Sequence, residues 1–306
     1  MQIIFLGTSG TIPTRFRNLP AIALKRKGRI FLFDAGEGTQ IQFIKASLSM
    51  HRIDDIFISH LHGDHIGGIP GILQSLSLLK RIKPLKIFGP KKLKQYISAI
   101  CENMYFALTF PVIIIEVTSG IIIDDREFYI ECTAAEHKID VLAYGFIEKS
   151  RLGKFFPEKA EKLGVPKPLW KKLQSGEEVI INNKTIRPSD VLGLERPGRK
   201  IVYAVDTRPC ENVLNLSAGV DLLIHDGMFT NDLHDKAIEG GHSTSSEAAE
   251  LAQKAGVKRL VLTHISSRYP NTSILLNEAQ SIFLNVEIAE DFLVIDLPLL
   301  KNMNKL

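Results

Sequence analysis

The residues of this 306-residue chain that could do chemistry are concentrated in one segment, SHLHGDH at residues 59–65. Four side chains able to bind a metal fall within six residues, although the chain has only 9 His. Imidazole and carboxylate ligands together suit zinc, and also manganese or iron. Because alternate residues of an extended segment point to opposite sides, we expect His60 and His62 to face one ion, and Asp64 and His65 to face another.

Two ions need more ligands than this motif supplies, so further His and Asp residues must contribute. Three of them follow β-branched runs, where the loops of α/β folds build their sites: His137, Asp206 and His264. A carboxylate from Asp206 could bridge the two ions. Asp34 follows another such run, and we expect it to orient a ligating His rather than to bind metal itself.

A further His, His242, lies in a Gly-rich turn, GGHSTSS at residues 240–246, directly before an expected helix. A His held there can be an exposed acid–base group. Two divalent ions about 3.5–4 Å apart suit the attack of hydroxide on phosphorus or on a carbonyl. Asp64 could bind metal and take or orient the proton of the attacking water, and His242 is our candidate proton donor to a leaving alkoxide.

The charge of the chain is unevenly distributed. There are 38 Lys and Arg against 34 Asp and Glu, which gives a net charge of +4, yet residues 149–200 alone carry 13 against 6, a net charge of +7. This segment also has five Pro and the only Trp, Trp170. We interpret it as an inserted arm for an acidic partner such as a nucleic acid, whose phosphates release counterions on binding.

Basic side chains in two places are candidates for binding that partner. Four of them belong to the arm: Lys154, Lys167, Lys171 and Lys172. Near the N-terminus, Arg15 and Arg17 flank Phe16, a pattern that could grip a phosphate and stack on a base.

The elements that must position these residues follow from hydrophobic periodicity. Short β-branched and aromatic runs predict strands near 2–6, 21–24, 30–34, 56–59, 85–88, 112–117, 121–123, 127–135, 144–148, 201–205, 221–225 and 259–263. Helical spacing predicts helices near 40–49, 69–80, 90–100 and 245–255, the last capped by Gly256. This order indicates a mixed α/β fold, with two mixed sheets packed face to face and helices outside. We expect one domain, 1–306, with the arm at 149–200 inserted into it.

Composition excludes several other classes of protein. No apolar window is long enough for a transmembrane helix, and the N-terminal MQIIFLGTSG predicts a strand rather than a signal peptide. The three Cys residues are far apart in the sequence, which argues against a disulfide framework and favours a cytoplasmic setting.

Together these segments resemble the short form of the RNase Z family, tRNA 3′-processing endoribonucleases of the metallo-β-lactamase superfamily. The resemblance covers nearly the whole chain. H-x-H-x-D-H alone marks only the superfamily, whereas the other segments are more specific. The matching segments are IIFLGTSGTIPT, FDAGEGTQIQ, SHLHGDHIGGIPGILQS, AAEHKI, AVDTRPC, GGHSTS and LTHISSRY.

The resemblance implies an αβ/βα four-layer sandwich and two zinc ions. One ion would bind His60, His62 and His137, the other Asp64, His65 and His264, with Asp206 between them. Asp64 would be the general base, and His242 would protonate the leaving 3′ oxygen. The cut would fall near the discriminator nucleotide, leaving a 3′-hydroxyl on the tRNA and a 5′-phosphate on the trailer. The family also implies a homodimer in which the arm of one subunit clamps the tRNA that the other cleaves.

Two positions depart from the family pattern. Arg15 replaces the Lys of P-x-K-x-R-N, and Asp226 replaces the Glu of His-Glu-Ala-Thr. The shorter side chain of Asp226 leaves open whether it supports His242. Two alternative functions also stay open: a small-molecule metallo-phosphodiesterase or arylsulfatase-like hydrolase, and a non-catalytic RNA-binding protein with structural metals.

Overall fold

The structure is a computed structural model that describes residues 1–103 and 107–299. Its chain forms two compact units. The core unit comprises Met1–Asp124, Tyr129–Phe146 and Lys200–Pro298. The second, here called the insertion unit, is built mainly from Ile147–Arg199 with Asp125–Phe128.

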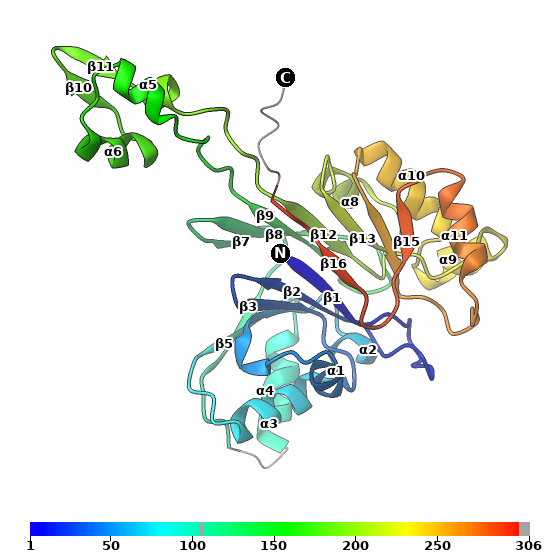
Figure 1. Ribbon diagram of the computed structural model, residues 1–306. Helices are drawn as coiled ribbons and strands as arrows, with labels where there is room; N and C mark the ends of the chain where they lie inside the picture. Colours follow the sequence, from blue (N-terminus) through cyan, green and yellow to red (C-terminus); the bar gives the residue numbers. More distant parts are fainter. Residues whose placement is uncertain (104–106, 300–306) are drawn as a thin grey trace. The chain divides into compact units, whose positions relative to one another are not determined.

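The first of two seven-stranded sheets in the core unit begins with antiparallel strands and continues with parallel ones (Figure 1). Strands β3 to β6 run parallel, so their carboxyl ends meet at one edge. In spatial order the strands are β16 (Val294–Asp296), β1 (Gln2–Gly7), β2 (Ala21–Arg26), β3 (Arg29–Phe33), β4 (Ile53–Phe57), β5 (Leu85–Gly89) and β6 (Val112–Glu116).

The second sheet likewise combines a parallel part with an antiparallel pair. Its strands β12 to β15 run parallel, whereas β7 and β8 are antiparallel. In spatial order the strands are β15 (Val286–Ile288), β14 (Leu260–Thr263), β13 (Leu222–Asp226), β12 (Lys200–Ala204), β9 (Leu142–Glu148), β8 (Phe128–Ala134) and β7 (Gly120–Asp124).

Aromatic side chains fill the space between the two sheets. Tyr144 on β9 packs against Phe33 and Phe57 of the first sheet, at ring-centroid distances of 6.1 and 5.5 Å. Tyr203 on β12 lies 5.6 Å from Phe33. The buried Tyr144 hydroxyl donates to the carbonyl of Ile58 at 2.7 Å, which satisfies its one polar group. The sheets therefore pack face to face.

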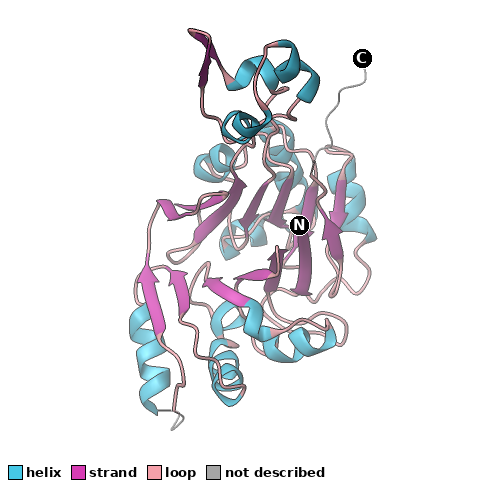
Figure 2. Ribbon diagram, turned by 60° about the vertical axis from the view of Figure 1, so that its left-hand side comes forward, coloured by secondary structure: helices cyan, strands magenta, loops and turns pink. Residues whose placement is uncertain are grey.

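Helices cover the outer faces of both sheets (Figures 1 and 2). Helix α3, for example, buries Ile69, Ile72, Leu73 and Leu76, one apolar stripe with helical spacing. The first sheet is covered by α1 (Thr39–Lys45), α3 (Ile69–Leu78) and α4 (Leu93–Asn103), and the second by α8 (Glu211–Leu216), α10 (Ser245–Ala255) and α11 (Ser273–Gln280). This confirms the mixed α/β sandwich expected from the sequence.

Several expected element boundaries were wrong by a few residues. The helix expected at 40–49 ends at Lys45, and Ser47 then has a positive φ of 54° that no helix continues through. The helix expected from Pro90 begins at Leu93, and the strand expected to reach Ser59 ends at Phe57. The cap of α10 is confirmed, since Gly256 has a left-handed φ of 64°.

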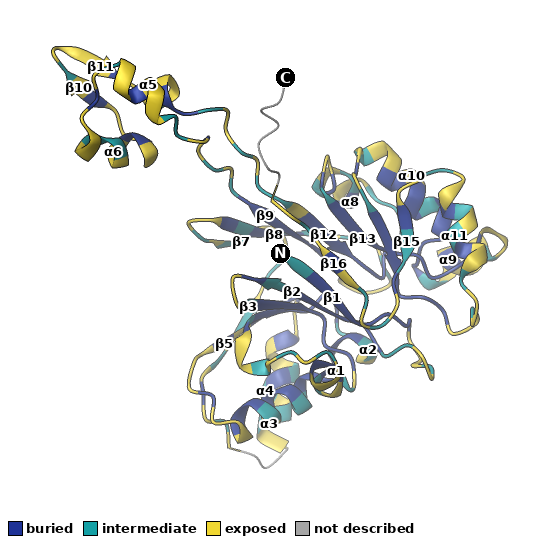
Figure 3. Cartoon of the chain, in the orientation of Figure 1, coloured by how far each residue is buried: buried dark blue, intermediate teal, exposed yellow. Residues whose placement is uncertain are grey.

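The insertion unit has a small apolar core of its own. The indole N–H of Trp170 donates to the carbonyl of Val165 at 2.9 Å, and Figure 3 shows mostly exposed residues around the few buried ones. Its elements are α5 (Pro157–Lys162), η2 (Lys167–Leu169), α6 (Trp170–Gln174), β10 (Val179–Ile181), β11 (Lys184–Ile186) and α7 (Pro188–Val191). Its buried residues are Ala160, Val165, Leu173, Val179, Ile186, Val191 and Leu192.

The three cysteines, Cys101, Cys132 and Cys210, are free thiols, as expected from their spacing. In the part of the chain that the structure describes, no helix is both long and apolar enough to cross a membrane.

Candidate metal centre

The ends of the parallel strands bring the expected metal ligands together. Asp34 follows β3, His60 lies beyond the end of β4, Asp206 follows β12, and His264 follows β14. Asp34, Asp206 and His264 all have positive φ angles, of 54°, 49° and 60°. Such a backbone is uncommon for residues other than Gly, and strain of this kind gathers at functional sites.

The SHLHGDH motif changes conformation in its middle. His60 lies in the loop after β4, and His62 is the N-cap of the short helix α2 (Gly63–Ile66), which carries Asp64 and His65. The motif was expected to be extended, with alternating residues on opposite sides. Instead, Asp64 and His65 lie in the helical turn of α2, and the ring of His65 packs 4.2 Å from that of His60.

One group of ligand atoms comes from His60, His62, His137 and Asp206. Nε2 of His60 lies 2.9 Å from Nδ1 of His62, which lies 3.4 Å from Nε2 of His137. Oδ2 of Asp206 lies 3.5 Å from Nε2 of His60 and 4.0 Å from Nε2 of His137. His137, which comes from the loop after β8, thus joins the motif across 75 residues of sequence.

A second group contains Asp64, His65 and His264. The Nε2 atoms of His65 and His264 lie 3.3 Å apart, and each is 3.5 Å from Oδ2 of Asp64. Oδ1 of Asp206 lies 3.2 and 3.1 Å from the same two nitrogens. Asp206 therefore turns one oxygen to each group.

The donor set suits a divalent metal ion. Four ligands of a tetrahedral zinc, each about 2.0–2.2 Å from the ion, lie roughly 3.3–3.6 Å from one another, close to the separations above. The buried Oδ1 of Asp206 has no hydrogen-bond partner among the described residues, an arrangement that is costly unless a cation satisfies it. Both groups could hold an ion.

Burial and neighbouring charges shift the pKa values of these groups. Burial would raise the pKa of Asp206, but His264, His65 and His60 outweigh it and hold that pKa well below 3.8. Burial, with help from His65, lowers the pKa of His60 well below 6.5. The ionised carboxylate of Asp206 and the neutral imidazole of His60 are the forms in which these two side chains bind metal. Burial would lower the pKa of His65, but Asp206 and Asp34 outweigh burial and raise it above 6.5.

Asp34 connects the motif to the rest of the sandwich, as expected of a carboxylate that orients a His. His65 Nδ1 donates to it at 2.7 Å, and so do the Ser59 backbone N–H at 2.6 Å and the Tyr203 hydroxyl at 2.7 Å. The Ser59 hydroxyl donates to Asp34 at 2.7 Å and lies 2.9 Å from Nδ1 of His60. Sequence reasoning missed Ser59 and Tyr203. The position of Ser59 as the first residue of the SHLHGDH segment was the one available signal.

The Gly turn before α10 orients a ligand of the first group. Nδ1 of His137 donates to the carbonyl of Gly241 at 2.9 Å. Gly241 has a φ of 75°, and a Cβ there would lie 2.7 Å from that nitrogen. Only Gly fits this close approach.

His242 follows in the same turn and is buried, not exposed as expected, with 8% of its surface accessible. Its ring lies 5.1 Å from that of His137 and 5.2 Å from that of His264. Nδ1 of His242 donates to Oδ2 of Asp226 at 2.9 Å, so the shorter Asp does reach it. Burial would lower the pKa of His242, but Asp226 outweighs burial and raises it above 6.5.

The two arginines near the N-terminus differ in their contacts. Arg15 is exposed beside Phe16, which is itself 79% exposed. The guanidinium of Arg17 donates to the hydroxyl of Thr8 at 2.8 Å and to the carbonyl of Ala289. The charge of Arg17 is thus engaged inside the core unit.

The basic residues expected to bind substrate from the arm lie in the insertion unit. All four are exposed: Lys154, Lys167, Lys171 and Lys172. Lys167 also lies over the ring of Trp170, 5.9 Å from its centroid.

Comparison with known proteins gives two family profiles, each matching less than half of the chain. Residues 1–147 match the profile of the anti-Pycsar protein Apyc1. Residues 173–265 match the profile of the beta-lactamase superfamily domain.

Relatives match over nearly the whole length. The ribonuclease Z of Methanosarcina mazei is 45% identical over 300 residues, covering 97% of this chain and 98% of that protein. The ribonuclease Z of Methanothermobacter thermautotrophicus is 44% identical over 297 residues, covering 97% and 96%. The crystal structure of the human tRNase Z, short form, is 30% identical with a TM-score of 0.74, covering 97% of this chain and 100% of that one. The chain therefore belongs to the ribonuclease Z family, hydrolytic endoribonucleases of the metallo-β-lactamase superfamily.

Proposed function

We propose that this protein removes the 3′ trailer from tRNA precursors by metal-dependent hydrolysis near the discriminator nucleotide. The products would be a 3′-hydroxyl on the tRNA and a 5′-phosphate on the trailer. The observation that carries the proposal is the pair of ligand groups that share Asp206, with His242 packed against a ring of each group.

The metal assignment is part of the proposal. His60, His62 and His137 would hold one zinc ion, and Asp64, His65 and His264 the other, with Asp206 contributing an oxygen to each. Manganese or iron would fit the same ligands. Bound there, two divalent ions supply an acidified water and stabilise negative charge on the phosphate oxygens.

Asp64 would act as the general base. Its Oδ2 faces the second group and also accepts the backbone N–H of Thr11 at 3.0 Å. Its pKa lies well below 3.8, because hydrogen bonds to His264 and His65 outweigh the opposing effect of burial. A carboxylate kept ionised in this way can accept a hydrogen bond from the attacking water and orient it.

His242 would protonate the leaving 3′ oxygen. Since Nδ1 is bonded to Asp226, Nε2 is the ring nitrogen left for the substrate. The carboxylate fixes the ring and stabilises its protonated form, as acidic partners of catalytic histidines do. A 3′ alkoxide is a poor leaving group, so this proton matters for RNA.

Binding of the substrate would rely largely on the basic segment at 149–200. Its exposed lysines offer phosphate contacts. Arg15 and Phe16 offer a second, smaller contact. A homodimer in which this arm clamps the partner's tRNA, and a cytoplasmic setting, stay predictions.

The test is incubation of purified protein with a 3′-extended tRNA transcript, with and without chelator, and mapping of the cut. We expect one cut near the discriminator nucleotide that disappears with chelator and returns with zinc. Turnover of small phosphodiesters far above that of RNA would favour the small-molecule hydrolase instead. Tight tRNA binding without cleavage would favour a non-catalytic RNA-binding protein.

A further inference from the structure

Beside the metal centre, Thr207 and Arg208 connect their own loop, which carries Asp206, to the loop of His137 and to the turn of His242. They directly follow Asp206, whose oxygens face both ligand groups. We propose that Arg208, held by Glu247, is a positioning residue that fixes His242 for proton transfer relative to the metal ligands. This inference rests on the proposed function and assigns a role to residues outside the ligand set.

The first tie joins this segment to the loop of His137. The backbone N–H of Arg208 donates to the carbonyl of Glu136 at 2.8 Å. In return, the Glu136 N–H donates to the Thr207 hydroxyl at 3.1 Å. Because His137 is the next residue after Glu136, the positions of Asp206 and His137 are set together.

The second tie joins it to the turn of His242. The Arg208 guanidinium donates to the backbone carbonyl of His242 at 2.6 Å. One residue along, the Ser243 hydroxyl donates to the carbonyl of Thr207 at 2.6 Å. The turn is therefore held at two adjacent residues by the segment that follows Asp206.

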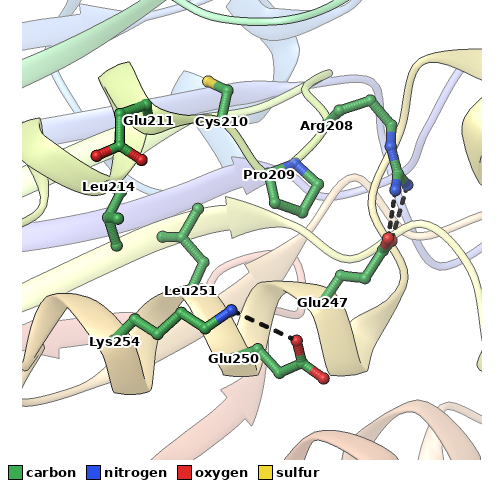
Figure 4. A pocket seen from close by; sticks show the side chains of 9 residues that line it. All are labelled: Arg208, Pro209, Cys210, Glu211, Leu214, Glu247, Glu250, Leu251 and Lys254. Atoms are coloured by element: carbon green, nitrogen blue, oxygen red, sulfur yellow. Dashed lines mark hydrogen bonds and ion pairs between the residues drawn. The ribbon is translucent and has the colours of Figure 1, made fainter.

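The third tie is an ion pair that keeps the Arg208 side chain in place (Figure 4). Both terminal nitrogens of Arg208 donate to Glu247, one of them to Oε2 at 2.7 Å. Glu247 in turn accepts the N–H of Thr244 at 2.9 Å, and its own N–H donates to the Thr244 hydroxyl at 3.2 Å, a capping box at the start of α10. The planar fork of Arg suits this two-point contact, which Lys cannot reproduce.

The surroundings of the Arg208–Glu247 ion pair allow Arg208 to be shortened without disrupting the fold. Arg208 and Glu247 line a cavity of about 330 Å³, together with Cys210 and Leu251. Shortening Arg208 therefore widens an existing space and does not open a void in a packed core. The fold should survive Arg208→Ala.

The decisive measurement compares two leaving groups. The RNA 3′ oxygen needs a proton to leave, whereas a nitrophenolate leaves without one. A residue that positions His242 should thus matter for RNA alone. We expect Arg208→Ala to lower kcat on a 3′-extended tRNA about 30- to 100-fold, and to lower kcat on bis(p-nitrophenyl) phosphate less than about threefold. The amount of bound metal, measured by elemental analysis, should be unchanged.

Five further variants sharpen this result. His242→Ala should show the same split between substrates, and Arg208→Ala combined with His242→Ala should be within about twofold of His242→Ala alone. Arg208→Lys and Glu247→Gln should fall between Arg208→Ala and the unaltered enzyme. Lys254→Ala, which alters another residue that lines the cavity but contacts Glu250 and not Arg208, should change neither substrate's kcat.

If Arg208→Ala lowered kcat equally on both substrates, or lost bound metal, Arg208 would only maintain structure and the inference would be overturned. Unchanged kcat on tRNA, or additive effects of Arg208→Ala and His242→Ala, would overturn it as well. Failure of the proposed function is distinguishable, because the unaltered enzyme would then not cut the tRNA precursor at all.

Discussion

Charged side chains have opposite environments in the metal centre of the core unit and in the insertion unit. Around the metal centre, charged side chains are buried and held by their neighbours: Asp34 alone accepts four hydrogen bonds, from Ser59, His65 and Tyr203. In the insertion unit, lysines such as Lys154 and Lys171 are exposed on a small domain with few buried residues.

This difference indicates a difference in task. A site that moves protons and holds metal ions needs groups fixed within fractions of an ångström, which burial and hydrogen bonding provide. Contact with a polyanion needs charge but little geometry, because phosphates are recognised largely by electrostatics. Substitutions in the core unit should therefore affect chemistry or metal affinity, and those in the insertion unit should affect substrate binding.

The largest effect should come from Asp64, which lies in the second ligand group and would serve as the general base. Asp64→Ala removes a ligand and the base together, so we expect kcat on a tRNA precursor to fall by at least about 10³-fold. The circular dichroism spectrum of this variant should match that of the unaltered enzyme. Asp235→Asn, which removes the charge of a fully exposed Asp, is the control and should retain full activity. Activity within tenfold of the unaltered enzyme would contradict the assignment of Asp64.

Asp34→Asn tests whether the buried hydrogen bonds tune the metal site. Asn keeps the shape of Asp34 but cannot accept from all of its donors, so His65 loses its charged partner. We expect metal affinity to fall about 10- to 100-fold, measured by competition with a chromophoric chelator. Asp291→Asn is a matched control, because Asp291 also accepts several hydrogen bonds, from Thr8, Asn18 and Gln42, but is not among the ligand groups. Equal losses in both variants would argue for a general effect on stability.

The sequence was informative where function depends on residue type at short spacing. Two His and an Asp–His pair within six residues pointed to two ions, and the rule that sites form at strand ends brought in His137, Asp206 and His264. The sandwich followed from the order of strands and helices. These signals are local or statistical, so they can be read without coordinates.

The sequence was uninformative where function depends on contacts between distant segments. Nothing in the spacing of Glu136, Arg208 and His242 shows that backbone and guanidinium groups join them. The burial of His242 likewise reflects contacts with distant segments, namely Asp226 at the end of β13 and the rings of His137 and His264, which the Gly residues of its turn do not reveal.

A smaller effect, on binding only, is expected from the insertion unit. Changing Lys154, Lys167, Lys171 and Lys172 together to Gln should raise KM for a tRNA precursor about tenfold at moderate salt and leave kcat on bis(p-nitrophenyl) phosphate unchanged. If all four contact phosphates, the slope of log(kcat/KM) against log[salt] should become shallower by about three. An unchanged salt slope would show that these lysines do not contact the RNA.

The smallest effects are expected from substituting Arg15 and Arg17, and the two should differ. The sequence pattern had predicted the same role, substrate binding, for both. The guanidinium of Arg17 is bonded to Thr8 and Ala289, so Arg17→Ala should cost about 1–3 kcal/mol of stability, seen as a lower Tm. Arg15 is exposed beside Phe16, so Arg15→Ala should leave Tm unchanged and raise KM for a tRNA precursor about threefold. A lower Tm for Arg15→Ala, or an unchanged Tm for Arg17→Ala, would contradict this division. The two variants share one loop and one residue type, so a difference between them can come only from whether the charge is engaged in the core or left exposed for a phosphate.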